Sequence, residues 1–176
     1  MGIETVVMSE PGRTHVQFVA VGQDDPLAAP LLDELADEYS SRYGSTRDAV
    51  MTWLLSQPAE VFAPPTGGMF VGLLAGEPVT GGAFQRFDDD TAELKRIWTH
   101  SAYRKRGLAK ALLTHLEDQI AARGYRKVYL TTGHLQPEAE ALYAAAGYTR
   151  LPEPLPADGT VFPVAFHKVL PAEESA

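Results

Sequence analysis

A strand, a basic turn and a helix follow one another within residues 93–120, and this succession constrains the fold more than any other part of the chain. Residues 93–99 have the composition of a strand. After the turn, large apolar side chains recur at every fourth position and form one face of a helix: Leu108, Leu112, Leu116 and Ile120. The first amide N–H groups of a helix have no partner within it, so this turn is expected to present free donors.

The turn itself, residues 104–109, has the chemistry of an anion site. Gly107 lets the backbone come close to a ligand. The helix dipole and the neighbouring cations favour a negative charge, and phosphate suits the site best: Arg104, Lys105, Arg106 and Lys110. A solvated basic helix start is the alternative interpretation of such a cluster.

Two common nucleotide-binding loops do not occur here: the chain has no G-x-x-x-x-G-K-[ST], and no G-x-G-x-x-G opens this helix. The turn resembles instead the pyrophosphate loop of the GCN5-related N-acetyltransferases, the GNAT superfamily, whose pattern is [Q/R]-x-x-G-x-[G/A]. The matching residues are Arg104, Gly107 and Ala109. Residues 136–148 resemble the family segment N-P-x-A-x-x-L-Y-x-x-x-G-[F/Y] almost residue for residue.

The resemblance implies acetyl-CoA as the co-substrate. In the family, the coenzyme A pyrophosphate binds the backbone of the turn, which Arg104 would support here: Lys105, Arg106, Gly107, Leu108, Ala109 and Lys110. The strand before the turn separates from the next strand in this family, and the pantetheine lies in the gap. Here the pantetheine would pair with the backbone of Ile97, Trp98 and Thr99. Gln136 stands where the family commonly has asparagine, and it either keeps that cofactor contact or loses it.

The resemblance also implies a catalytic acid. Tyr143 occupies the family's general-acid position, which gives a proton to the departing thiolate. The alternative is a structural role, because Tyr143 also extends an apolar stripe formed by Ala139, Leu142 and Ala146. Its place within the matched segment favours the acid.

Glu93 is the candidate base that takes a proton from the acceptor amine, directly or through water, because related enzymes often carry a glutamate at this strand position. A structural carboxylate paired with Lys95 or Arg96 is an equally weighted alternative. His100 and His134 each follow a strand, and either is a further candidate for the base or for an acceptor contact.

Composition excludes several other chemistries. The chain has no cysteine, which excludes a cysteine acyl-enzyme, a disulfide and a thiolate metal site, and which fits a cytoplasmic protein. The five histidines show no metal-ligand spacing, so no metal is expected. The formal net charge of −8 disfavours nucleic acid as a partner. No apolar run approaches the length of a membrane span, and the N-terminus lacks the pattern of a secretion signal.

Hydrophobic periodicity and turn residues predict a single domain over residues 1–176, with residues 1–15 and 171–176 partly mobile. The expected strands are residues 16–21, 69–75, 79–87, 91–99, 127–132 and 160–169. Helices are expected between residues 25 and 44, 46 and 55, 108 and 123, and 137 and 146. This order predicts a mixed α/β fold with a mostly antiparallel central sheet flanked by helices, as in the GNAT family.

We therefore expect an N-acetyltransferase that moves an acetyl group from acetyl-CoA directly to an amine in a ternary complex. A small-molecule amine is the favoured acceptor, and a protein N-terminus or lysine is the alternative. The rival interpretation is a non-catalytic acyl-CoA-binding sensor or interaction module with the same fold. Homodimers are frequent in the family, although no residue here identifies an interface. Five aromatic residues either line an acceptor pocket or belong to the core: Tyr39, Tyr43, Trp53, Phe62 and Phe162.

Overall fold

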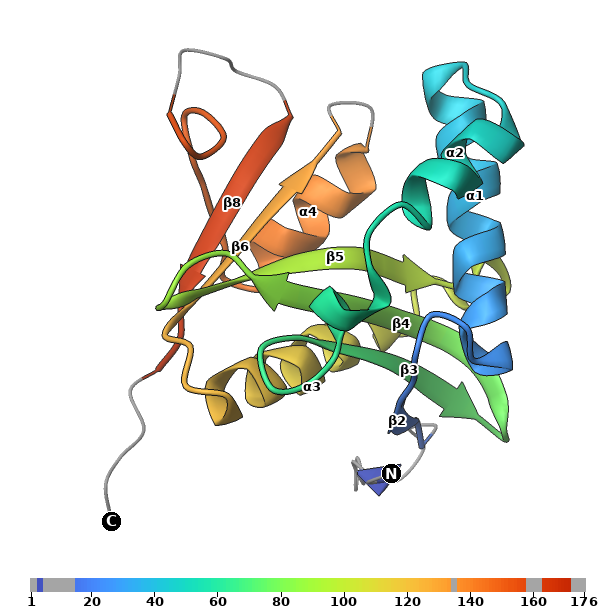
Figure 1. The fold of residues 1–176 in the computed structure, drawn as a ribbon, viewed down its shortest axis with the longest axis horizontal. Coiled ribbons are helices and arrows are strands. Elements are labelled where there is room, and N and C mark those ends of the chain that lie inside the picture. Colours follow the sequence, from blue (N-terminus) through green and yellow to red (C-terminus); the bar gives the residue numbers. More distant parts are fainter. Residues whose placement is uncertain (1–2, 5–14, 134–135, 158–162, 172–176) are drawn as a thin grey trace.

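The computed structural model describes residues 3–4, 15–133, 136–157 and 163–171, so most of the terminal residues expected to be mobile lie outside the described part. The described strands form one sheet in the order β1-β2-β3-β4-β5-β6-β8-β7 (Figure 1). Their bounds are Ile3–Glu4, Gln17–Ala20, Gly68–Leu74, Glu77–Arg86, Thr91–Thr99, Lys127–Thr132, Thr149–Arg150 and Val164–Val169 for β1 to β8. Only β5 and β6 pair in parallel, which confirms the mixed, mostly antiparallel sheet.

Four α-helices accompany the described part of the sheet: α1 (Ala29–Tyr43), α2 (Arg47–Leu54), α3 (Leu108–Ala122) and α4 (Pro137–Ala145). Short 3-10 helices lie next to these elements. η1 (Pro26–Ala28) precedes α1, η2 (Ala59–Phe62) follows α2, and η3 (Ser101–Tyr103) follows β5. Side chains cap two of the helix starts: the Asp25 carboxylate accepts a hydrogen bond from the Leu27 N–H at 2.9 Å before η1, and the Thr46 hydroxyl accepts one from the Ala49 N–H at 3.1 Å before α2. No helix of the described chain is long and apolar enough to cross a membrane.

Helices cover both faces of the sheet. The neighbours of two consecutive glycines in β4 identify the helix on each face. Consecutive strand residues face opposite sides. A Cβ on Gly81 would lie 2.8 Å from Leu31 of α1, whereas a Cβ on Gly82 would lie 3.2 Å from Leu116 of α3. α1 and α2 therefore pack on one face and α3 on the other, each over its own hydrophobic core (Figure 1).

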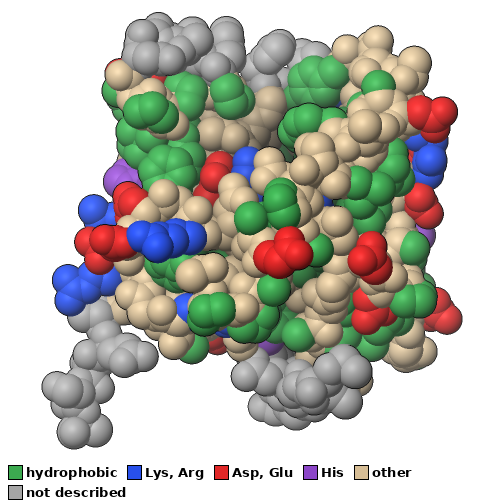
Figure 2. Space-filling model, viewed as in Figure 1, with side chains coloured by type: hydrophobic (Ala, Val, Ile, Leu, Met, Phe, Trp, Pro, Cys, Tyr) green, Lys and Arg blue, Asp and Glu red, His purple; other side chains and the backbone are tan. Residues whose placement is uncertain are grey.

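The outer surface mixes the two signs of charge. On the face shown in Figure 2, acidic and basic side chains lie among one another and among apolar side chains. This face therefore carries both signs of charge, in a chain whose formal net charge is −8.

β5 and β6 separate part-way along their length. Parallel pairing joins only Thr91–Glu93 of β5 to Lys127–Tyr129 of β6, although β5 continues to Thr99. The edge of β5 beyond Glu93 therefore has no neighbouring strand on the β6 side. This confirms the expected separation of the strand that precedes the basic turn.

A β-bulge lies in the same part of β5. Gly81 and Ala83 of β4 are opposite Trp98 and Lys95 of β5, so β5 has one residue more than β4 over this interval. Arg96 lies within it and has a φ of 58°, in the left-handed region. The bulge changes the direction of the side chains at the point where the two strands part.

The structure differs from the sequence-based expectation in a few bounds. β8 begins at Val164 rather than at residue 160, and residues 158–162 lie outside the described part. β7, only two residues long, was not expected, because two residues carry no detectable alternation.

Candidate active site

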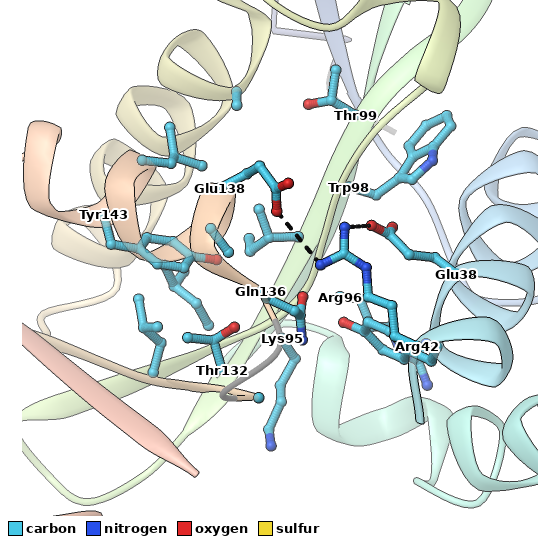
Figure 3. A pocket seen from close by; sticks show the side chains of 18 of the residues that line it. Glu38, Arg42, Lys95, Arg96, Trp98, Thr99, Thr132, Gln136, Glu138 and Tyr143 are labelled. Atoms are coloured by element: carbon cyan, nitrogen blue, oxygen red, sulfur yellow. Dashed lines mark hydrogen bonds and ion pairs between the residues drawn. The ribbon is translucent and has the colours of Figure 1, made fainter. Parts of the chain in front are cut away.

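A cavity with a volume of ≈ 1060 Å³ opens where β5 and β6 separate. Its walls come from the C-terminal part of α1, from α2, from β5 and β6, from the beginning of α3 and from most of α4 (Figure 3). The cavity thus brings together segments that are far apart in the sequence.

The basic turn forms one end of this cavity. Gly107, with a φ of 78°, is the N-cap residue of α3 and provides no side-chain cap. The Ala111 N–H donates to the Gly107 carbonyl at 3.1 Å, so the N–H groups before Ala111 have no helix partner. Of the seven turn residues predicted to bind the cofactor, all except Arg106 line the cavity: Arg104, Lys105, Gly107, Leu108, Ala109 and Lys110. The Arg106 guanidinium lies over the Tyr103 ring, 5.1 Å from its centroid.

The geometry of this turn fits a pyrophosphate. Free N–H groups, the positive end of a helix dipole and nearby cations are what such a group requires. A Cβ on Gly107 would meet no atom within 4 Å, so the approach to the backbone is open. Arg104 ties the turn to its surroundings, since its guanidinium lies 3.5 Å from both the Glu38 carboxylate and the Thr99 carbonyl.

The separated strand forms the long wall of the cavity. Ile97, Trp98 and Thr99 all line it, as the resemblance implies for the pantetheine. The Trp98 side chain is buried, and its Nε1–H donates to Glu34 of α1 at 2.9 Å. Glu34 also accepts from the N–H and the hydroxyl of Ser101, at 3.0 and 2.9 Å. α1 therefore fixes the end of β5 and the chain that leads into the turn.

Tyr143 projects from α4 into the cavity, where Figure 3 shows its ring. The side chain is 5% exposed and packs against Tyr148 and Phe166. Among the described residues, its hydroxyl has no hydrogen-bond partner. Burial, with a smaller contribution from Tyr39, raises the pKa of Tyr143 well above its ordinary value of 10.0. The structure thus places a neutral hydroxyl that keeps its proton in the same cavity as the turn, as a general acid requires.

The candidate bases are farther from the cavity. Glu93 does not line the cavity. Its carboxylate accepts a hydrogen bond from the Gln85 amide at 3.1 Å and lies 3.3 Å from the ammonium group of Lys95. Lys95 does line the cavity. The pairing with Lys95 agrees with the structural alternative, so a catalytic role for Glu93 requires a water or a movement of Lys95. His100 does not line the cavity either, and its Nδ1 accepts from the Ala102 N–H at 3.1 Å. His134 lies outside the described residues.

Two contacts between side chains cross the cavity from α1 to the beginning of α4. Gln136 lines the cavity, and its side-chain amide donates to the Tyr43 hydroxyl at 3.3 Å. Arg42 lies between Glu38 and Glu138, at 3.0 and 3.5 Å (Figure 3). Sequence reasoning did not identify Glu38, Arg42 or Glu138, and it could not have done so, because Arg42 and Glu138 are 96 residues apart and belong to no common motif.

Of the five aromatic residues on which two interpretations were open, the four that the structure describes line the cavity. Tyr39, Tyr43, Trp53 and Phe62 line it, although Phe62 also belongs to the core and Phe162 lies outside the described residues. No group of three or more potential metal ligands occurs in the described part of the chain.

One cavity is surrounded by an uncapped basic helix start, a strand edge without a neighbour and a buried neutral tyrosine. Together, these three features define the site of a coenzyme A-dependent acyltransferase. Residues 29–148 match the model of the acetyltransferase (GNAT) family. The chain therefore belongs to this family and is an acetyl-CoA-dependent acyltransferase.

Individual relatives agree with this assignment. The chain is 30% identical over 145 residues to the uncharacterized N-acetyltransferase YjgM of Escherichia coli K12, a match that covers 79% of this chain and 84% of that protein. It is 31% identical over 122 residues to N-acetylaspartate synthetase of Danio rerio, covering 64% of this chain and 43% of that protein. The structure of PaiA N-acetyltransferase from Thermoplasma acidophilum in complex with coenzyme A has the same fold, with a TM-score of 0.68 at 14% identity over 88% of this chain and 99% of that one.

Proposed function

We propose that this protein transfers the acetyl group of acetyl-CoA to a primary amine of a small molecule, by direct transfer within a ternary complex. One observation carries the proposal. The free edge of β5, the uncapped start of α3 and the buried hydroxyl of Tyr143 all face one cavity.

The chain's own groups would position both substrates. Bound acetyl-CoA supplies an activated thioester. The N–H groups of Leu108, Ala109 and Lys110 hold the pyrophosphate, and the backbone of Ile97, Trp98 and Thr99 pairs with the pantetheine. A backbone N–H of β5 near the bulge would donate to the thioester oxygen as that oxygen gains charge.

The proton transfers would use two side chains. The amine nitrogen forms a bond to the acetyl carbon, and the bond from that carbon to sulfur breaks. Tyr143 gives its proton to the sulfur, while Glu93, through a water molecule, takes the proton that the amine loses. Direct transfer is the simpler route, because the chain has no cysteine that would carry the acetyl group.

A small acceptor fits the shape of the cavity better than a folded protein does. The contacts of Tyr43 with Gln136 and of Arg42 with Glu138 span the cavity between α1 and α4. A lysine side chain of a protein would have to pass between them with its backbone attached. The name of the Danio rerio relative, N-acetylaspartate synthetase, also refers to a small N-acetylated product.

Calorimetric titration with acetyl-CoA and coenzyme A is the first test. We expect a Kd near or below about 100 μM, equivalent to roughly 5.5 kcal/mol of binding free energy. Thiol release in the presence of a panel of small amines then separates an enzyme from an acyl-CoA sensor. Folded protein that binds neither compound would contradict the proposed cofactor site, and binding without acceptor-dependent thiol release would favour the sensor.

A further inference from the structure

Charge is unevenly distributed around the cavity. Among the residues that the structure describes, six cations and two carboxylates line it: Glu38, Arg42, Lys95, Arg96, Arg104, Lys105, Lys110 and Glu138. Both carboxylates are already paired with Arg42, and Glu38 is also paired with Arg104. A chain with a net charge of −8 therefore has a cavity that attracts anions.

The remaining cations fall into two groups. Lys105 and Lys110 belong to the turn, where the pyrophosphate of the cofactor accounts for them. Lys95 and Arg96 lie on β5, three to four residues before Thr99, which corresponds to about 10–13 Å along a strand. They lie that far from the end of β5 that leads into the turn, so the phosphates at the turn do not explain their charge.

The bulge in β5 places these two cations on the same face of the sheet. Consecutive strand residues ordinarily point to opposite faces, but a bulge interrupts this alternation. Lys95 is opposite Ala83, which belongs to the core under α1 and α2. The Arg96 guanidinium lies 4.5 Å from the centroid of Phe62 and 4.0 Å from the Met69 sulfur, both in that same core.

Arg96 is a buried cation without an anionic partner. Its side chain donates to the Leu54 carbonyl and, at 3.2 Å, to the Gln23 side-chain oxygen, and the residue is 8% exposed. No acidic side chain within the described ranges forms an ion pair with it. Burying an unpaired charge is costly unless an opposite charge compensates it. Lys95, with 37% of its side chain exposed, forms an ion pair with Glu93, which does not line the cavity.

We propose that the acceptor is an amine that also carries a carboxylate, and that Lys95 and Arg96 determine this specificity. The inference rests on the proposed function, since it concerns the acceptor of that reaction. The carboxylate lies at the end of the cavity formed by α2 and η2, where it balances the charge of Arg96 and is within reach of Lys95. The amine then points toward the gap between β5 and β6. Phe62 and Trp53, which line the same end, contact the carbon skeleton of the acceptor.

The test compares each acceptor that carries a carboxylate with the corresponding amide, which lacks that negative charge. The full chain is assayed for thiol release from acetyl-CoA with α-amino acids, β-alanine and 4-aminobutyrate, each beside its amide, at matched fractions of neutral amine. We expect the carboxylate form of the preferred acceptor to have a kcat/KM about 10- to 100-fold above that of its amide, the range expected for one charge-assisted contact. Lys95→Gln is expected to bring this ratio close to one, chiefly by raising the KM of the carboxylate form.

Two further variants complete the design. Lys127→Gln, a matched change of an exposed lysine at the start of β6, is expected to leave the ratio unchanged. Arg96→Lys, which keeps the charge, is expected to retain more of the preference for the carboxylate form over the amide than Arg96→Met does. If Arg96→Met does not fold, Lys95→Gln alone provides the test.

The outcomes separate this inference from the proposed function. Equal use of acids and amides, a preference for amides, or a ratio that Lys95→Gln leaves intact would overturn the inference while acetyl transfer to amines stands. Acetyl-CoA binding without thiol release for any acceptor in either series would overturn the proposed function and the inference with it.

Discussion

At the scale of single residues, packing sets the proton affinity of two side chains in opposite directions. Tyr143 is buried without a hydrogen-bond partner in the described structure, so its neutral form is favoured and its pKa rises. For Glu34, burial alone would raise the pKa, but the hydrogen bonds from Trp98 and Ser101 outweigh burial and lower the pKa below 4.5. Tyr143 thereby keeps its proton, which its proposed role as the acid requires, and Glu34 stays charged and holds α1 against β5.

Replacing Tyr143 by phenylalanine tests the proposed acid. The ring still fills its place between Tyr148 and Phe166, so the fold and the Kd for acetyl-CoA are expected to stay unchanged. We expect kcat to fall by about 10²- to 10⁴-fold. Because the pKa of Tyr143 lies above 10.0, the loss is expected to be the same at every pH below 10.0. Stopped-flow or steady-state thiol release across pH measures this, and full turnover in the variant would rule out the acid role.

Replacing Glu34 by glutamine tests its contribution to acid stability. The pKa of Glu34 is lower in the folded state than its ordinary value of 4.5, so its stabilising contribution is complete above that value and is lost as the pH falls through the lowered pKa. Glu34→Gln is therefore expected to be less stable than the parent at neutral pH, with the difference shrinking below about pH 4. Urea unfolding at a series of pH values measures the difference. A gap that stays constant down to about pH 3 would contradict this assignment.

At the scale of elements, the start of α3 serves two purposes. Gly107 ends the basic turn in the left-handed region and at the same time leaves the first N–H groups of α3 without a cap. A side chain such as serine at this position would satisfy one of these N–H groups and remove it from the site. The helix therefore lacks a local stabilising contact at the point where we propose that the cofactor binds.

Gly107→Ala and Gly76→Ala form a matched pair for this element. Gly107 and Gly76 have φ angles of 78° and 83°, and a Cβ on either would meet no atom within 4 Å. Each variant is therefore expected to lose about 1–2 kcal/mol of unfolding free energy, from backbone strain alone. Only Gly107→Ala is expected to weaken acetyl-CoA binding, because Gly76 lies in the turn between β3 and β4, away from the cavity. Calorimetry on both variants gives the comparison, and equal affinities would place the pyrophosphate elsewhere.

At the scale of the whole molecule, the pairing of the sheet is interrupted at the proposed active site. The parallel pairing of β5 with β6 ends after three residues, and the bulge in β5 lies just beyond this point. α1 and α2 pack on one face of the sheet and α3 on the other, while the strands on either side of this point remain paired. The cavity therefore lies within a sheet that is covered by helices on both faces.

The contrast between an acidic molecule and a basic cavity predicts a strong dependence of cofactor binding on salt. The Debye length falls from about 30 Å at 0.01 M to about 8 Å at 0.15 M ionic strength, which screens the attraction of the cavity for phosphates. We expect the Kd for acetyl-CoA to rise steadily over this range. Lys110→Gln is expected to reduce the slope, whereas Lys127→Gln is expected to leave it as it is. A Kd independent of salt would mean that the lining cations do not face the phosphates.

The sequence by itself determined the structural features that depend on residues close to one another along the chain. The end of α1 at Gly44 and the bounds of β6 at residues 127–132 agree with the structure. Each of these features rests on contacts within a few residues, which periodicity and capping patterns record. The resemblance of the basic turn and of the segment around Tyr143 to the GNAT motifs added the family, which the match over residues 29–148 confirmed. A single domain, a cytoplasmic location and a homodimer stay predictions.

Only the tertiary structure decided which side chains share the cavity and how they are charged. No pattern in the sequence shows that Arg42 meets Glu138, or that Arg96 is buried without a carboxylate partner among the residues that the structure describes. These facts follow from the bulge in β5 and from the packing of α1 and α2 over it, which join segments tens of residues apart. Local preferences set the elements, but the charge and shape of the site arise from contacts between distant elements, and these form only when the sheet and both helical layers come together.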